Sequence, residues 1–181
     1  MILANLAVSG RARTKGSLDP VRRPDGGTYM RENNPQSKPW RAKVARACRE
    51  YQLAEFGALR RFEGPVEVRC VFFLPRQDSV NGGPVPSSDT EWPVSITTGD
   101  TDKLLRNVGD ALLMPKRKSD ATVTSGLIMD DSQIVSWFGL KVWCLPEYEA
   151  AQARILVVAA TTPESSLAAE RDVWGSFGAK L

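Results

Sequence analysis

The feature that most restricts the fold is a strongly amphipathic helix, expected between residues 100 and 113. Its apolar side chains recur at helical spacing and form one stripe, made of Leu104, Leu105, Val108, Ala111 and Leu112. Asp102, Arg106 and Asp110 follow one another at four-residue steps and occupy a different, polar face. A helix of this kind must bury its stripe against a second layer of structure.

The elements around this helix predict the α+β fold class. A second helix is expected at about 38–57, with Ser37 as its N-cap and an end near Gly57. Residues 10–27 and 76–99 are expected to form loops, although a short strand could cover 28–30. Longer strand patterns cover 2–8, 65–74, 134–144 and 154–160.

The order of these elements predicts a small mixed β-sheet with two main helices packed on it. The last two strands, 134–144 and 154–160, are expected to form an antiparallel pair. The 181 residues suffice for one domain, expected over 1–162, with a C-terminal tail at 163–181.

The cysteines and the hydropathy pattern indicate a cytoplasmic protein. Cys48, Cys70 and Cys144 are isolated in the sequence, so reduced thiols are expected rather than a zinc site or a disulfide framework. No stretch is long and apolar enough to span a membrane, and the first residues lack the basic region of a secretory signal.

Charge is distributed unevenly along the chain. Residues 11–50 contain eleven basic and four acidic residues, a net charge of +7, whereas residues 78–131 contain five basic and nine acidic residues, a net charge of −4. A basic region beside an acidic centre suits a polyanionic substrate and a metal site. A solvated charged surface is the ordinary alternative.

The chain contains no histidine, which excludes imidazole catalysis and histidine-ligated metals. Carboxylates are the candidate chemical groups instead. Asp100 and Asp102 stand at the expected start of the 100–113 helix, and Asp130 and Asp131 directly precede the 134–144 strand. Oxygen-only clusters suit Mg²⁺, but Asp at a helix start is also a common cap, so both interpretations stay open here.

A three-carboxylate site would form if Asp131 lies where its strand passes the start of the helix. Mg²⁺ bound there would relieve carboxylate repulsion and activate a water molecule for attack on phosphorus. Arg106, one turn after Asp102, would contact the scissile phosphate; its ordinary role would be an ion pair with Asp102. These features suggest metal-assisted cleavage of a phosphodiester.

Three motifs together resemble the core signature of the RusA-type Holliday junction resolvases. They are Asp100-Thr101-Asp102-Lys103-Leu104-Leu105-Arg106, Asp110-Ala111-Leu112 and Asp130-Asp131-Ser132-Gln133-Ile134. The Pro-Val-Glu-Val strand start at 65–68 and the Trp-led helix after a Gly-Gly-Thr-Tyr segment are similar to the family as well. The resemblance covers about residues 15–160.

The resemblance implies a RusA-like homodimer that cuts four-way DNA junctions by paired, Mg²⁺-dependent nicks during DNA recombination and repair. It implies catalytic roles for Asp100, Asp102, Asp131 and Arg106, and metal ligation by the three aspartates together with Asp130. Such proteins are common in phages and prophages, which implies the cytoplasm of a bacterial host. No organic cofactor and no membrane partner is expected.

This chain departs from the family pattern at three places. Arg106 replaces a lysine, which keeps the charge but excludes proton transfer by that group. Lys103 stands where asparagine often follows the second aspartate, and the 113–129 segment is longer than in compact members. The candidate DNA-binding residues are Lys15, Arg22, Arg23, Lys103, Lys116, Arg117 and Lys118.

Three alternatives to a junction resolvase remain open from the sequence. One is a protein that binds branched DNA without cutting it, although acidic residues weaken a purely electrostatic interaction with phosphates. Another is a metal-dependent nuclease for other branched or single-stranded DNA. The third is a structural core whose acidic residues are incidental.

Overall fold

The computed structural model of the chain describes residues 1–75, 92–93, 98–116, 118–144 and 151–160. The helices are α1 (Ser37–Phe56) and α2 (Thr101–Leu112), with short 3₁₀ turns η3 (Lys118–Asp120) and η4 (Asp131–Gln133). The strands are β1 (Ile2–Ser9), β2 (Leu18–Arg22), β3 (Thr28–Glu32), β4 (Val66–Leu74), β5 (Ile134–Trp143) and β6 (Gln152–Ala159). The expected α+β fold with a small mixed sheet and two main helices is confirmed. The tail at 163–181 and most of the 76–99 segment lie outside the described residues.

The main sheet has four strands in the order β1-β6-β4-β5. β4 is parallel to β5 and antiparallel to β6, and β6 is antiparallel to β1. The expected pairing of the last two strands is therefore wrong, because β4 lies between β5 and β6. β4 is continuously buried over its first five residues and alternates between buried and partly buried residues only toward its end, as expected for a central strand.

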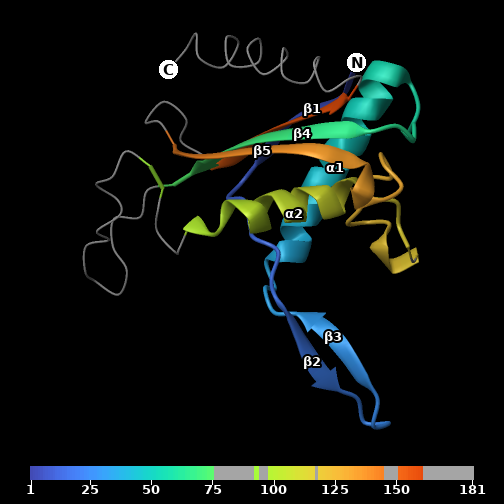
Figure 1. The fold of residues 1–181 in the computed structure, drawn as a ribbon, viewed down its shortest axis with the longest axis vertical. Coiled ribbons are helices and arrows are strands. Elements are labelled where there is room, and N and C mark those ends of the chain that lie inside the picture. The colour runs from blue at the N-terminus through green and yellow to red at the C-terminus, as the bar shows by residue number, and fades with distance from the viewer. Residues whose placement is uncertain (76–91, 94–97, 117, 145–150, 161–181) are drawn as a thin grey trace.

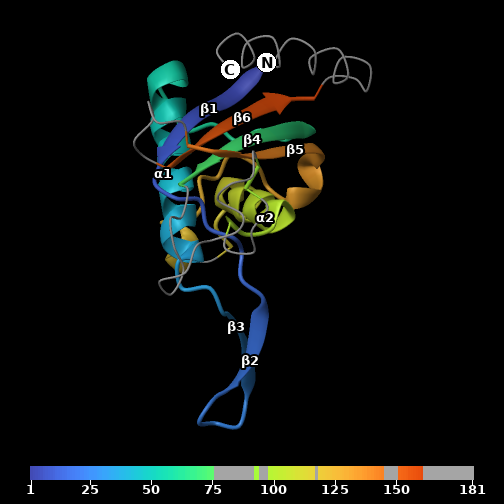
Figure 2. The same ribbon diagram turned by 90° about the vertical axis from the view of Figure 1, so that its left-hand side faces the viewer.

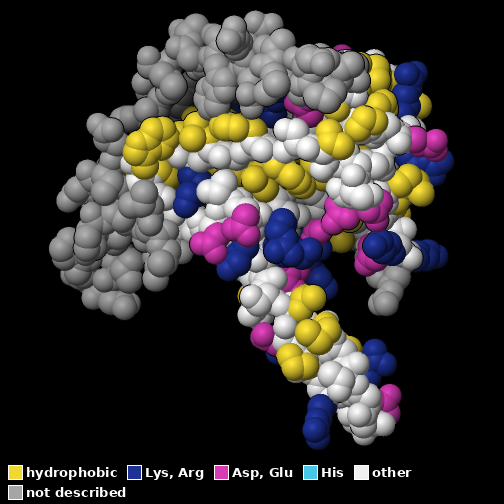
Figure 3. Space-filling view, in the orientation of Figure 1, with side chains coloured by type: hydrophobic (Ala, Val, Ile, Leu, Met, Phe, Trp, Pro, Cys, Tyr) yellow, Lys and Arg dark blue, Asp and Glu magenta, His cyan; other side chains and the backbone are white. Residues whose placement is uncertain are grey.

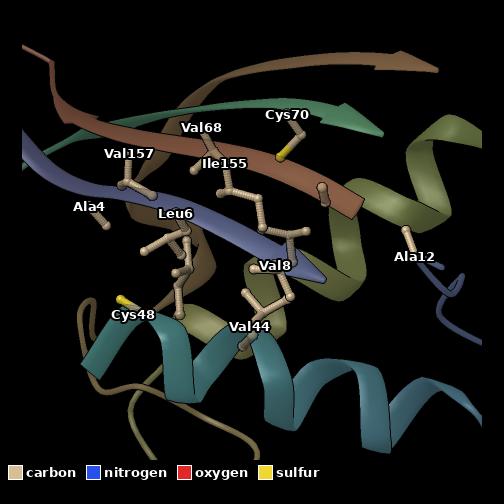
Figure 4. Packing of buried hydrophobic residues seen from close by; sticks show 14 of the residues in the cluster. Ala4, Leu6, Val8, Ala12, Val44, Cys48, Val68, Cys70, Ile155 and Val157 are labelled. Carbon is tan, nitrogen blue, oxygen red and sulfur yellow. The ribbon is translucent and has the colours of Figure 1, made fainter. Parts of the chain in front are cut away.

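Both helices pack on the same face of this sheet, which gives a two-layer domain (Figures 1 and 2). α1 contacts β1 and α2, whereas α2 also contacts β5. Figure 4 shows Val44 and Cys48 of α1 directed toward Leu6 of β1 and Val157 of β6. The buried stripe expected for α2 is confirmed at Leu104, Val108, Ala111 and Leu112, while Leu105 is partly buried.

A two-stranded hairpin, formed by β2 and β3, projects away from the two layers (Figures 1 and 2). The expectation of a loop over 10–27 is thus wrong for residues 18–22, which pair with 28–32 in antiparallel register. Pro20 made a strand at 18–22 unexpected, since proline has no N–H and is tolerated only at strand positions that need no backbone donor. Gly26 closes the hairpin turn with φ 83°, a conformation that favours glycine.

The ends of α1 agree with the sequence at one end and differ at the other. Gly57 adopts the left-handed conformation that terminates the helix, as expected. Ser37 is not the N-cap: Gln36 holds that position without a side-chain hydrogen bond, and Ser37 is buried as the first helical residue. The Ser37 hydroxyl instead donates a hydrogen bond to Asn107 Oδ1 of α2 (3.1 Å).

All three cysteines are unpaired, with Cys48 and Cys70 buried and Cys144 partly exposed. Burial raises the pKa of the Cys48 and Cys70 thiols, so neither is a reactive thiolate near neutral pH. None of the helices in the described part of the chain combines the length and apolar character needed to cross a membrane.

Candidate metal-binding and nucleic-acid-binding surface

Asp100 and Asp102 are exposed at the start of α2. Asp100 occupies the N-cap position, but its side chain makes no capping hydrogen bond. Asp102 lies in the first turn, where a carboxylate complements the helix dipole. Capping was the ordinary interpretation of Asp100, and the structure shows that its carboxylate does not serve this purpose.

The carboxylate of Asp100 is paired with a lysine one turn along the helix. Asp100 Oδ2 lies 2.9 Å from Lys103 Nζ, and this hydrogen bond lowers the pKa of Asp100 and raises that of Lys103. Lys141 of β5 lies nearby and donates to the carbonyl of Gly99 (2.8 Å). Partial burial lowers the pKa of Lys141, against a smaller opposing effect of Asp100.

The second acidic pair lies on the turn that leads into β5. Asp130 caps η4 through a reciprocal arrangement, in which its side chain accepts from Ser132 N (3.0 Å) and Gln133 Oε1 accepts from Asp130 N (3.2 Å). The backbone N–H of Ser132 is the main reason that the pKa of Asp130 is lowered. Asp131, the first residue of η4, is exposed and leaves its carboxylate at the surface.

Within one chain, the two acidic pairs lie at opposite ends of α2. Gly109 packs against the side chains of Trp137 and Ile134, whereas Gly139 packs against Leu105 and Thr101. β5 therefore runs antiparallel to α2, so its beginning lies beside the end of the helix. The twelve residues of α2 span roughly 18 Å, so the two acidic pairs are separated by about the length of this helix.

This arrangement does not bring the three expected ligands together in a single chain. Among the described residues, no three acidic or cysteine side chains lie close enough to hold a metal ion. Figure 3 shows acidic side chains in separate groups on the face that carries α2, with basic side chains between them.

Arg106 is exposed on α2, between the two acidic groups. Within the described part of the chain it forms no ion pair, so the ordinary alternative for this residue, an ion pair with Asp102, is absent there. Its guanidinium is consequently available to an external anion.

A polar cluster that the sequence did not predict joins the hairpin to both helices. Asp110 Oδ2 lies 2.8 Å from Lys15 Nζ and 3.2 Å from Arg41 Nη2. Arg41 also lies 3.2 Å from Glu32 Oε2 at the base of the hairpin, and Glu32 Oε1 accepts from Gly16 N (2.9 Å). Lys15, a predicted DNA-binding residue, is thus held in an internal ion pair.

Asn107 is the fully buried centre of this cluster. Its Oδ1 accepts from Arg41 Nε (3.0 Å) and Ser37 Oγ, and its Nδ2 donates to the carbonyl of Arg13 (2.8 Å). The available signal in the sequence was a polar residue on the apolar side of the 100–113 helix, since buried polar groups require partners.

The remaining predicted DNA-binding residues lie on two projecting features. Arg22 and Arg23 lie at the turn end of the hairpin, where the Arg23 guanidinium stacks over the Tyr29 ring (5.5 Å to the centroid). Lys116 and Lys118 are exposed after α2, and Lys116 contributes to the lowered pKa of Asp130. Arg117 lies outside the described residues.

The chain matches no model of a known protein family and no curated protein sequence.

Proposed function

We propose that this protein is a Mg²⁺-dependent endonuclease that cuts branched DNA, with the four-way junction as its substrate, as the resemblance to the RusA-type resolvases implies. The observation that carries the proposal is the state of the aspartates. Asp100, Asp102 and Asp131 are all exposed, and none of them serves as a side-chain helix cap. Carboxylates left in this state on a surface with free arginine are suited to metal ions and phosphates.

The separation of the carboxylates requires two copies of the chain for one metal site. A two-fold axis near the middle of α2 and β5 reverses the direction of both elements in the second copy. The Asp131 end of one chain then lies at the Asp100 end of its partner. A dimer of this kind contains two composite sites, each with Asp100 and Asp102 from one chain and Asp131 from the other.

β5 is the element that suits this dimer contact. It is a ten-residue strand at the end of the described sheet, so one of its edges has no strand partner there. Val135 and Trp137 expose 61% and 38% of their surface, respectively. A long apolar edge strand favours pairing with another chain, and antiparallel pairing of β5 with its copy gives the required reversal.

The donor chemistry of the composite site fits Mg²⁺, because all of its ligands are carboxylate oxygens. Asp100 and Asp102 would hold the ion together with the partner's Asp131, and Asp130 would orient the acidic turn. The bound ion would lower the pKa of a water molecule and stabilise charge on the phosphate. Arg106 would bind the scissile phosphate, and Lys103, released from Asp100, would face the same strand.

The test is cleavage of a labelled synthetic four-way junction and of linear duplex with the same sequence, each with Mg²⁺ and with EDTA. The proposal predicts symmetric, Mg²⁺-dependent nicks in the junction alone, and their loss in Asp102→Asn with junction binding retained. Equal cutting of both DNAs would indicate a nuclease without junction selectivity. Binding without cutting in any metal would support the non-cleaving alternative.

A further inference from the structure

A groove of about 360 Å³ lies between the C-terminal part of α1 with the turn that follows it and the segment that follows α2. Among the residues that the structure describes, its charged lining consists of Arg49, Arg60 and Arg61, without an acidic side chain. The rest of its wall is formed by Leu59, Met114, Pro115, Ala121, Thr124, Ser125 and Gly126. None of the three arginines belongs to the surface described above.

Both walls of the groove are fixed by hydrogen bonds. The fully buried Gln52 accepts from the backbone N–H of Arg60 through its Oε1 (2.6 Å), which holds the turn after α1. Arg49 Nη1 donates to the carbonyls of Thr124 (2.5 Å) and Ala121 (3.3 Å), which ties the opposite wall to the helix. The cationic groups are therefore presented by a rigid frame.

The positive charge of the groove is only partly neutralised. Within the described residues, Arg49 and Arg60 have no acidic partner, and the Arg60 guanidinium stacks over the Phe56 ring (5.2 Å to the centroid). Arg61 pairs with Glu63 (3.0 Å), but both side chains are largely exposed, so the pair is weak and exchangeable. The ordinary role of such cations is to complement the C-terminal end of α1.

The groove is linked directly to the acidic turn. Gln133, two residues after Asp131, donates through Nε2 to the carbonyls of Phe62 (3.0 Å) and Gly64 (2.9 Å). Phe62 follows Arg61, and its N–H donates to the carbonyl of Leu127 (2.7 Å). These hydrogen bonds anchor the turn that carries Asp131 to the residue that directly follows Arg61.

We infer that this groove binds the sugar–phosphate backbone of a DNA arm leaving the cleavage site. The inference rests on the proposed function for its position, and the charge of the groove supplies the chemistry. Guanidinium groups along an open groove contact phosphates rather than base edges, so the contacts should be independent of sequence and equal for junction arms and duplex.

The test measures equilibrium binding of a four-way junction and of duplex DNA over a series of salt concentrations in EDTA. The variant is Arg60→Gln/Arg61→Gln, and Arg154→Gln removes a charge from an exposed position on β6 as the matched control. Arg61→Lys keeps the charge. The melting temperature of each variant separates lost contacts from lost folding.

The expected result is roughly tenfold weaker binding of both DNAs by the double variant and a log–log salt slope smaller by about two. Arg154→Gln and Arg61→Lys should retain the wild-type slope. An unchanged slope in the double variant would overturn the groove while leaving the proposed function intact. If the wild type binds DNA through the groove arginines but does not cut it, DNA binding by the groove would be supported and the proposed nuclease activity would be overturned.

A competing source of phosphate groups is a free nucleotide or inorganic phosphate. Titration of the wild type with inorganic phosphate and with thymidine monophosphate distinguishes it. Saturable binding of either one that is lost in the double variant, with unchanged DNA affinity, would overturn the DNA inference. Failure of the wild type to bind any DNA would overturn both proposals.

Discussion

At the scale of single residues, Lys103 is the main partner of the Asp100 carboxylate. The two side chains form an exposed ion pair, and the hydrogen bond from Lys103 favours the ionised carboxylate. A group whose pKa is lowered in the folded state stays charged as the pH falls until that lower pKa is reached. Because the chain has no histidine, no imidazole titrates between about pH 5 and 8.

Lys103→Gln should raise the pKa of Asp100 toward the ordinary value for aspartate, since it removes the hydrogen bond and the nearby charge. Carbon-13 NMR titration of the carboxyl carbons measures this directly. High salt should reduce the difference between wild type and variant, because the pair is exposed. Lys118→Gln is the matched control and should leave Asp100 unchanged, and an identical Asp100 pKa in Lys103→Gln would refute the pairing.

Asn107→Ala should lower the free energy of unfolding by about 2 kcal/mol. The substitution removes the acceptor of Ser37 Oγ and of Arg41 Nε and the donor to the carbonyl of Arg13, while Arg41 Nη2 keeps its ion pairs with Glu32 and Asp110. Urea denaturation measures the loss, and exposed Thr122→Ala should change stability by less than about 0.5 kcal/mol. A similarly small effect of Asn107→Ala would show that the cluster does not need its central amide.

At the scale of elements, the position of the acidic pairs depends on the packing of α2 against β5. Glycine lowers helix stability, yet Gly109 lies inside α2 because Trp137 of β5 fills the space that its side chain would occupy. A Cβ at residue 109 would lie 2.7 Å from Trp137 Cη2. This close approach fixes which end of β5 lies beside which end of α2.

Gly109→Ala should therefore destabilise the protein by about 1–3 kcal/mol, even though alanine favours the helix. Thermal or chemical denaturation provides the measurement. In the Trp137→Phe background, Gly109→Ala should lower stability less than it does in the wild type, because the smaller ring leaves room for the added methyl group. If Gly109→Ala stabilised the protein, the described contact between α2 and β5 would be wrong.

The hairpin of β2 and β3 should contribute to DNA binding without contributing to the core. Its strands are exposed on both faces, apart from Val21 and Glu32, which are partly buried. Arg22→Gln/Arg23→Gln should leave the unfolding free energy within about 0.5 kcal/mol of wild type. The same change should reduce the salt slope of junction binding by about two, whereas Arg154→Gln should not. A normal slope would remove the hairpin from the DNA interface.

The sequence predicted local elements better than their assembly. Periodicity located α1, α2, β1 and β4, because apolar spacing is a property of a short segment. The hairpin was missed because Pro20 weakens the strand pattern. The position of β4 between β5 and β6 depends on distant segments, which no local pattern encodes.

The candidate site shows the same division. Its residues were named from their chemistry and spacing, and the structure places all those it describes at least partly at the surface. Their separation at opposite ends of α2 could not be predicted from the sequence, because it depends on the direction of β5 relative to α2. The buried partners of Asp110 were missed for the same reason, since Lys15 and Arg41 come from distant segments.

At the scale of the whole molecule, the two-layer domain is a scaffold that presents one acidic pair at each end of α2. A single chain separates the proposed ligands, and the proposed two-fold dimer would join them. The same dimer would place two cleavage sites in one assembly, which is what paired nicks in opposing strands of a four-way junction require. The proposed activity therefore depends on dimer formation.

The most direct measurement is junction nicking by purified heterodimers carrying two different affinity tags. Asp102→Asn paired with Asp131→Asn should regain about half of the wild-type nicking rate, because one composite site contains only intact aspartates. Wild type paired with the double variant Asp102→Asn/Asp131→Asn should be inactive, because each composite site then contains a substituted ligand. The opposite pattern, an inactive first heterodimer and an active second one, would show that each site lies within a single chain.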